Sequence, residues 1–176
     1  MLVKQLDAAT LPQARALVNR VFPSQGVSER LSFLVIAHRQ SWWASVLMRL
    51  FGVSAMLDFF VAVDDKGDVI GTSGLYSYVK DEHEAAWAAW FCVAPESRRM
   101  GVGSALLDHT IEQARTRGLK YLRLYTSEDP NERAAQALYE KKGLKTISRT
   151  KRLFWTRIVR EKPLRDNPRQ PESEGN

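Results

Sequence analysis

The chain has 176 residues, a formal net charge of +6 and 44% hydrophobic residues. This length fits one domain and leaves little room for two, and the composition is typical of a soluble globular protein. The single cysteine excludes an intrachain disulfide, while the basic excess favours anionic partners without choosing among nucleic acid, membrane surfaces and phosphorylated cofactors.

The N-terminal part of the chain predicts one strand followed by helices. Residues 2–6 alternate and predict a short edge strand, and 9–21 predict a helix with Pro12 in its first turn. A second helical region opens at Ser28 and ends at Gly52. The first ten residues lack the apolar run of a signal peptide, so we expect a cytoplasmic protein.

The apolar period then changes from helical to strand-like. Residues 57–64 and 69–79 predict two strands joined by the turn 65–68, whose Asp and Gly suit a hairpin. A third strand is predicted at 85–93 after a polar loop. These strands predict an antiparallel unit at the centre of the chain.

The C-terminal part predicts a crossing helix and a closing hairpin. The elements expected here are a long helix ending at 117–120, a strand at 121–126, a helix at 131–142 and two strands at 144–150 and 152–159. We therefore predict an α+β fold with a mixed, mostly antiparallel sheet of about six or seven strands flanked by helices. Residues 1–160 form the single predicted domain, and the polar, Pro-rich tail 161–176 is predicted to be disordered.

The stretch 98-RRMGVGSALL-107 joins a predicted strand to the long helix. No Lys follows Gly103, which argues against a P-loop, and Leu106 replaces the third glycine of a dinucleotide fingerprint. The free amides and dipole of a helix N-terminus still favour an anion, and Gly101 and Gly103 leave the backbone accessible. The loop therefore predicts a cradle for the pyrophosphate of a diphosphate-bearing ligand.

A second motif, 134-AAQALYEKKGL-144, follows on the next helix. With both motifs, the chain resembles the GNAT superfamily of N-acetyltransferases, which use acetyl-coenzyme A (acetyl-CoA). The signature Gln/Arg-x-x-Gly-x-Gly/Ala matches 98–103, and 91-FCVAP-95 matches the family's fourth strand and the proline after it. The resemblance spans about Val3 to Val159 and is strongest from Trp90 to Leu144.

The resemblance implies a GNAT-like fold, acetyl-CoA as acyl donor and direct attack of a primary amine on the thioester. It implies that Phe91, Cys92 and Val93 bind the pantetheine arm through their backbone, as an added strand would. It also implies that the pyrophosphate is held by the loop residues Arg98, Arg99, Met100, Gly101, Val102, Gly103 and Ser104. Tyr139 matches the family's tyrosine near the cofactor sulfur and is the expected catalytic acid, the alternative being a packed Tyr that bonds a backbone carbonyl.

Three positions depart from the family pattern. Many members have Gly where Arg99 stands, and many have an Asn where this chain has Glu132, one residue after Asn131. Because one residue turns a side chain by about 100° on a helix, Asn131 is a doubtful cofactor ligand. Trp87 stands where some relatives place a glutamate base, and the nearest carboxylates, Glu82 and Glu84, lie upstream. The sequence therefore identifies no general base.

Trp43, Tyr76 and Trp87 are the expected acceptor-binding residues, since aromatic side chains line the side opposite the cofactor arm. No metal is expected, because the three histidines show no ligand spacing, and Cys92 has no adjacent base to make it a nucleophile. The expected partners are acetyl-CoA and an amine acceptor, with no nucleic acid and no membrane span, and we also consider a homodimer. A non-catalytic acyl-CoA-binding module of the same fold is the alternative.

Overall fold

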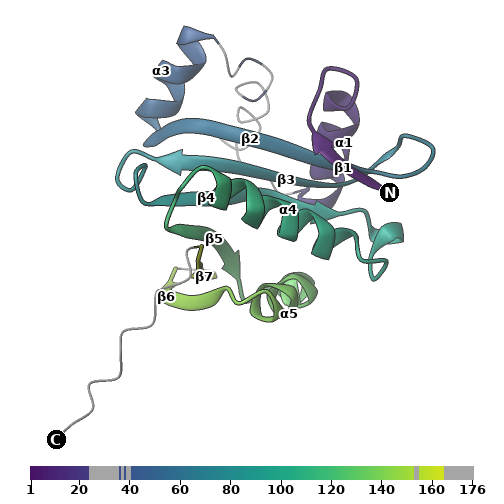
Figure 1. The fold of residues 1–176 in the computed structure, drawn as a ribbon. Coiled ribbons are helices and arrows are strands. Elements are labelled where there is room, and N and C mark those ends of the chain that lie inside the picture. Colours follow the sequence, from purple (N-terminus) through teal and green to yellow (C-terminus); the bar gives the residue numbers. More distant parts are fainter. Residues whose placement is uncertain (24–35, 37, 39–40, 153–154, 165–176) are drawn as a thin grey trace, which may run out of the picture.

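The computed structural model describes residues 1–23, 36, 38, 41–152 and 155–164. The helix start predicted at Ser28 lies outside these residues, as does most of the predicted tail. One sheet organises the described part of the chain, with helices on both of its faces (Figure 1).

The sheet has seven strands in the order β1-β2-β3-β4-β5-β7-β6. They are β1 (Leu2–Gln5), β2 (Val53–Val63), β3 (Val69–Tyr78), β4 (Ala85–Val93), β5 (Tyr121–Ser127), β6 (Lys145–Lys151) and β7 (Thr156–Pro163). Only β4 and β5 pair in parallel, and every other neighbouring pair is antiparallel. The prediction of a mixed, mostly antiparallel sheet of six to seven strands is confirmed.

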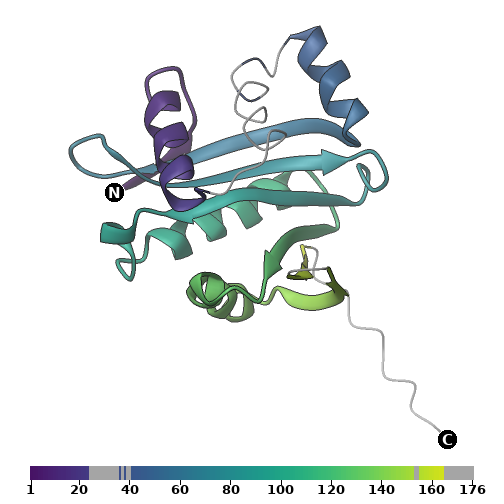
Figure 2. The same cartoon turned by 180° about the vertical axis from the view of Figure 1, so that it is seen from behind.

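The helices divide between the two faces of the sheet. They are α1 (Leu11–Val21), α3 (Trp42–Leu50), α4 (Val102–Thr116) and α5 (Arg133–Lys141), with short 3-10 helices at Pro95–Ser97 and Pro130–Glu132. Helix α4 crosses one face in Figure 1, and Figure 2 shows α1 on the other. Each face has its own apolar core, with Leu106 and Leu107 of α4 in one and Leu17 and Val18 of α1 in the other.

Two predicted boundaries need correction. Strand β2 begins at Val53 rather than at 57, because it pairs with the far end of β3, Val53 lying opposite Tyr78. Strand β7 runs to Pro163, beyond the predicted domain end at 160, and Leu164 after it is buried. Pro163 ends the strand, because proline has no amide to donate to the ladder.

Candidate active site

The strands β4 and β5 pair along only part of their length. Their register runs from Ala85 opposite Tyr121 to Ala88 opposite Leu124. Beyond Ala88, β4 continues to Val93 with no partner strand on its β5 side among the described residues. The two strands therefore part, and β4 offers an open edge next to the point of parting.

A bulge in β4 marks this point. Trp90 has a left-handed φ of 51°, and the pairing with β3 shifts register between Thr72 and Gly74. The Thr72 hydroxyl donates to the Trp90 carbonyl at 2.5 Å and holds the bulged backbone in place. Because a bulge bends its strand, it accounts for the divergence of β4 from β5. Phe91, Cys92 and Val93, the residues expected to bind the pantetheine arm, lie on the open edge.

The loop after β4 turns through two left-handed residues before α4 begins. Arg99 has a φ of 63° and Gly101 a φ of 85°. A Cβ on Gly101 would meet nothing within 4 Å, so the backbone there is open to a ligand. The residues expected to hold the pyrophosphate, 98–104, therefore form one turn that leads into the free amides of the α4 N-terminus.

Close packing also requires a glycine at position 103, which the sequence did not indicate. A Cβ there would lie 3.3 Å from Leu138 Cδ2 of α5 and 3.5 Å from Val93 Cγ2 of β4. The glycine thus lets the start of α4 lie close to both elements. This contact fixes the expected pyrophosphate loop relative to the open edge of β4.

The two arginines of the loop, Arg98 and Arg99, form no ion pair with a described carboxylate, unlike Arg20 nearby. Arg98 Nε donates to the Val93 carbonyl at 3.4 Å, so its side chain folds back toward the end of β4. Neither Arg98 nor Arg99 forms an ion pair with a carboxylate in the part of the chain that the structure describes, whereas Arg20 pairs with Glu96. Their positive charge is available to an anionic ligand.

Tyr139 lies on α5, beside the open edge of β4. Its ring centroid is 5.7 Å from that of Phe91, and only 6% of the residue is exposed. Burial, and after it the carboxylate of Glu132, raise the pKa of Tyr139 above its usual range. Within the described residues its hydroxyl makes no hydrogen bond, so the bond to a backbone carbonyl that the alternative role requires is not seen.

Glu132 connects the end of β5 to the start of α5. Its carboxylate accepts hydrogen bonds from the Thr126 hydroxyl at 2.5 Å and from the Ser127 amide at 2.8 Å. Asn131 is exposed, and its backbone amide donates to Asp129 at 2.8 Å. Glu132 therefore has a structural role in the place where many relatives have Asn.

Cys92 is buried on the α1 side of the sheet. Burial raises the pKa of its thiol to about 11, and the Thr72 hydroxyl lies 3.2 Å from its sulfur. A thiol with this pKa is almost entirely protonated at neutral pH, and the thiolate is the nucleophilic form. The geometry gives Cys92 a packing role and leaves only its backbone for ligand binding.

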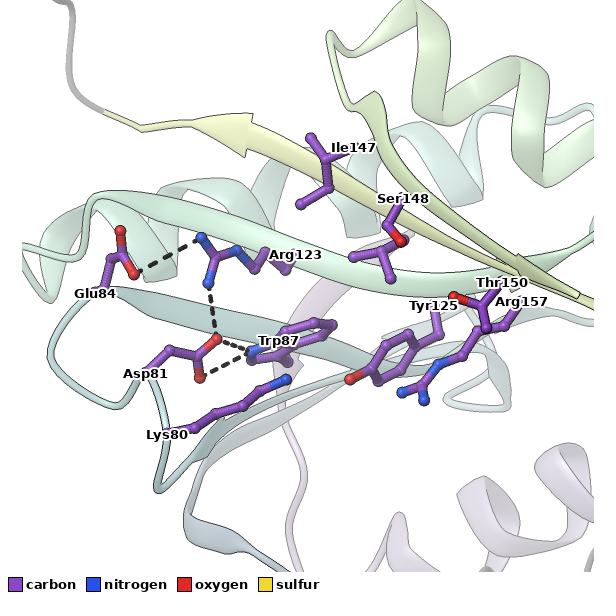
Figure 3. Close-up of a pocket in the computed structure, with 11 residues that line it drawn as sticks. Lys80, Asp81, Glu84, Trp87, Arg123, Tyr125, Ile147, Ser148, Thr150 and Arg157 are labelled. Atoms are coloured by element: carbon purple, nitrogen blue, oxygen red, sulfur yellow. Dashed lines mark hydrogen bonds and ion pairs between the residues drawn. The ribbon is translucent and has the colours of Figure 1, made fainter.

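A pocket of about 440 Å³ lies on the sheet face opposite α4, where β4 and β5 are still paired (Figure 3). It is lined by Lys80, Asp81, Glu84, Trp87, Arg123, Tyr125, Ile147, Ser148, Thr150, Arg157 and Val159. Side chains alternate along a strand, and Ala88 packs in the α4 core, so Trp87 faces the pocket. Tyr139 and the pocket therefore lie on opposite faces of the sheet, next to the point where β4 and β5 part.

The expected acceptor-binding residues are only partly brought together. Trp87 lines the pocket, where its indole Nε1 donates to Asp81 Oδ2 at 3.0 Å and its ring lies 4.5 Å from that of Tyr125. Tyr76 is next to it in the sheet, since it pairs with Trp87 and its ring lies 5.0 Å from Tyr78. Trp43 lies apart on α3, packed against His38 and the start of β2.

Several pocket residues were not predicted from the sequence, among them Tyr125, Arg123 and Arg157. The alternation of 121-YLRLYT-126 was a usable signal, because it places Tyr121, Arg123 and Tyr125 on one face. Arg123 is held by Asp81 at 2.8 Å and Glu161 at 2.7 Å.

The sequence predicts neither a metal site nor a membrane span, and the structure can be searched for both only in its described residues. Within the described ranges, no group of three or more potential metal-ligating side chains comes together. No helix in that part of the chain has the length and apolarity to cross a bilayer.

Comparison with known proteins adds to this geometry. A family model described as "Acetyltransferase (GNAT) family" matches residues 21–144. The fold is similar to that of a GNAT-family acetyltransferase from Staphylococcus aureus Mu50, with a TM-score of 0.71 and 15% identity over 93% of this chain and 99% of that chain. Comparison with curated protein sequences gives no significant match.

Two further solved structures share the fold. The ribosomal-protein-S18-alanine N-acetyltransferase from Escherichia coli has a TM-score of 0.67 and 19% identity over 96% of this chain and 97% of that chain. An aminoglycoside 6'-N-acetyltransferase complexed with coenzyme A has a TM-score of 0.71 and 15% identity over 96% of this chain and all (100%) of that chain. These likenesses confirm the predicted fold.

Proposed function

Because the chain belongs to the GNAT family of acetyltransferases, as its motifs predicted, we propose that it transfers the acetyl group of acetyl-CoA to the primary amine of an acceptor. The observation that supports this most strongly is the parting of β4 and β5. At this point the edge of β4 is open, Tyr139 lies on one face of the sheet, and the polar pocket lies on the other face. Donor and acceptor can then meet at one point from opposite sides.

The open edge of β4 and the loop after it fit the donor. The backbone groups of Phe91, Cys92 and Val93 would bind the pantetheine arm in place of the missing neighbouring strand. The amides that follow Gly101 would bind the pyrophosphate, with Arg98 and Arg99 adding positive charge. Acetyl-CoA supplies the activated acyl group as a thioester.

The chemistry is a direct transfer. The neutral amine attacks the thioester carbonyl carbon, a C–N bond forms, and the C–S bond breaks. The nitrogen releases one proton to water, and Tyr139 donates its phenolic proton to the departing sulfur and recovers one from water. The products are an N-acetylated acceptor and coenzyme A as the free thiol, with no net change in protons. The raised pKa keeps the Tyr139 phenol protonated and available as this donor at neutral pH.

No general base is assigned among the described residues of the pocket. Asp81 is bonded to Trp87 and Arg123, and Glu84 lies 3.8 Å from Arg123 at the far end of the pocket. The acceptor therefore binds as the neutral amine, or its ammonium group loses a proton to water before the attack.

The test is an assay of free thiol release from acetyl-CoA with a panel of primary amines. We expect release that depends on the amine, together with an acceptor heavier by one acetyl group in mass spectrometry. Saturable binding of acetyl-CoA without release for any amine would instead support the non-catalytic binding module. The absence of acetyl-CoA binding would overturn both.

A further inference from the structure

The pocket has an aromatic floor. Trp87 and Tyr125 lie 4.5 Å apart with an angle of 31° between their planes, and Tyr78 stands edge-on to Trp87 at 5.2 Å. Such a floor accepts flat or apolar groups. The three rings come from β3, β4 and β5, so rigid strands hold them in place.

Two cations lie against this floor at opposite ends, as Figure 3 shows. The ammonium of Lys80 lies 5.2 Å from the centre of the Tyr78 ring and 5.1 Å from that of Trp87. The guanidinium of Arg157 lies 3.6 Å from the centre of the Tyr125 ring. Both are held by the rings and still face the pocket.

The charges in the pocket are unevenly paired. Arg123 takes up the nearby carboxylates, with Asp81 at 2.8 Å, Glu161 at 2.7 Å and Glu84 at 3.8 Å. Lys80 and Arg157 have no carboxylate partner in an ion pair anywhere in the described part of the chain. Lys80 and Arg157 are thus the two cations of the pocket that form no ion pair with a described carboxylate, and both are available to a ligand.

The position of Arg157 relates this charge to the reaction. Arg157 pairs with Ser127 of β5, beyond Leu124, where β4 and β5 have already parted. Its guanidinium reaches back over Tyr125. Because one face of the guanidinium lies on the ring, its edge donors remain for an anion, and this fork matches a carboxylate or a phosphate.

We infer that the acceptor is an amine that also carries an anionic group, a carboxylate or a phosphate. The guanidinium of Arg157 binds this group, the ammonium of Lys80 adds positive charge, and the apolar part of the acceptor lies on Trp87 and Tyr125. This inference rests on the proposed function. A simple amine has no group that can pair with Lys80 and Arg157. An acceptor with an acidic group can form charge-assisted hydrogen bonds with them and is a better substrate.

The experiment compares matched amine pairs in the thiol-release assay. The pairs are phenylalanine and phenethylamine, tryptophan and tryptamine, and O-phosphoethanolamine and ethanolamine. We expect the acidic member to have the higher kcat/KM in at least one pair, and the phosphate pair separates the two anion sources. A preference for the neutral-tailed amine in all three pairs would overturn the inference and leave the proposed function intact.

Two variants assign the effect to the cations. Arg157→Gln is expected to raise KM for the preferred acidic acceptor by about 10- to 100-fold, the equivalent of one charge-assisted hydrogen bond. Lys80→Gln is expected to have a smaller effect of the same kind, and KM for acetyl-CoA should change in neither. Lys66→Gln, in the exposed turn between β2 and β3, is the matched control. An unchanged KM for the acidic acceptor in Arg157→Gln would overturn the inference.

A binding measurement keeps the test independent of turnover. Quenching of tryptophan fluorescence by phenylalanine and phenethylamine can be followed in the wild-type protein without acetyl-CoA. Tighter binding of phenylalanine that Arg157→Gln abolishes supports the acidic acceptor even where no thiol is released, in which case only the proposed transfer fails. Equal or tighter binding of phenethylamine contradicts the inference.

Discussion

The two faces of the sheet differ sharply where β4 and β5 part. On the α4 face, the side chains at the parting are Phe91 and Tyr139, and the expected donor contacts are backbone groups. On the opposite face, the pocket is lined by charged and aromatic side chains such as Arg157 and Trp87. A site that binds its ligand through backbone groups constrains only a few positions of the sequence, such as glycines. A site that binds through side chains changes its specificity whenever one of those side chains is substituted. The expected donor site can therefore be predicted from sequence motifs, whereas the proposed acceptor site depends on residues that come together only in the folded chain.

The largest expected effect comes from removing the floor of the pocket. Trp87→Ala deletes a side chain that is 2% exposed and is expected to lower the free energy of unfolding by about 3–5 kcal/mol. Urea unfolding measures this loss. If the two faces are independent, the folded fraction binds acetyl-CoA with unchanged affinity while KM for the acceptor rises.

Trp87→Phe is the milder companion to this variant. It keeps a smaller ring on the floor, and removes the hydrogen bond from the indole to Asp81 together with part of the buried ring. We expect a smaller loss of stability, of about 1–3 kcal/mol, because the Asp81 acceptor remains buried but keeps its bond to Arg123. A parallel loss of acetyl-CoA affinity in both variants would break the division into a donor face and an acceptor face.

On the other face, Tyr139→Phe keeps the ring and removes the hydroxyl. We expect kcat to fall about 100-fold, since a positioned general acid contributes at least this much, while KM for acetyl-CoA stays the same. Steady-state thiol release measures both. Tyr121→Phe, at the far end of the β4–β5 pairing, is the matched control and should leave kcat unchanged. Equal rates in wild type and Tyr139→Phe would refute the acid role.

The pH dependence sharpens the same assignment. Burial raises the pKa of Tyr139 above the usual value near 10, so the phenol remains protonated throughout the neutral and moderately alkaline range. The wild-type kcat should therefore show no fall from Tyr139 deprotonation up to about pH 10. A fall in kcat below that pH that disappears in Tyr139→Phe would contradict the expected protonation state.

The loop and helix that are expected to bind the donor could be located from the sequence because their signals are local. The glycines at 101 and 103 and the run from Ala134 to Leu144 each lie within one turn or helix, so their spacing carries over directly into the fold. The bulge at Trp90 was not predicted, since it depends on the pairing of β4 with β3. The departure at Arg99 was noted from the sequence, and the structure gives it a left-handed φ.

The pocket that is proposed to bind the acceptor was predicted less completely because its residues meet only through long-range pairing. Trp87 was reached by counting along one strand, but Arg157 enters the pocket through the register of β7 on β5, which no local pattern encodes. Trp43 was expected in the mouth on the basis of its aromatic character. It lies on α3, which packs against β2, and its contact with the acceptor remains a prediction.

The smallest expected effect tests whether the donor loop tolerates its unusual residue at a cost. Arg99 has a Cβ at a φ of 63°, a conformation that disfavours residues other than glycine by about 1–2 kcal/mol. Arg99→Gly removes that strain but gives the unfolded chain more freedom, which offsets about 0.4–1 kcal/mol of the gain. We expect a net stabilisation of about 0.8 kcal/mol, the difference between the midpoints of these two ranges, measured by urea unfolding.

The matched control for this substitution is Met100→Gly. Met100 is exposed and has no positive φ, so glycine there brings only the entropic cost and should destabilise slightly. Arg99→Gly should also weaken acetyl-CoA binding modestly, since it removes one exposed cation beside the expected pyrophosphate site. Gain of stability with loss of affinity would show that the arginine is retained for its charge despite its backbone. Loss of both stability and affinity would mean that the left-handed backbone at Arg99 is not strained.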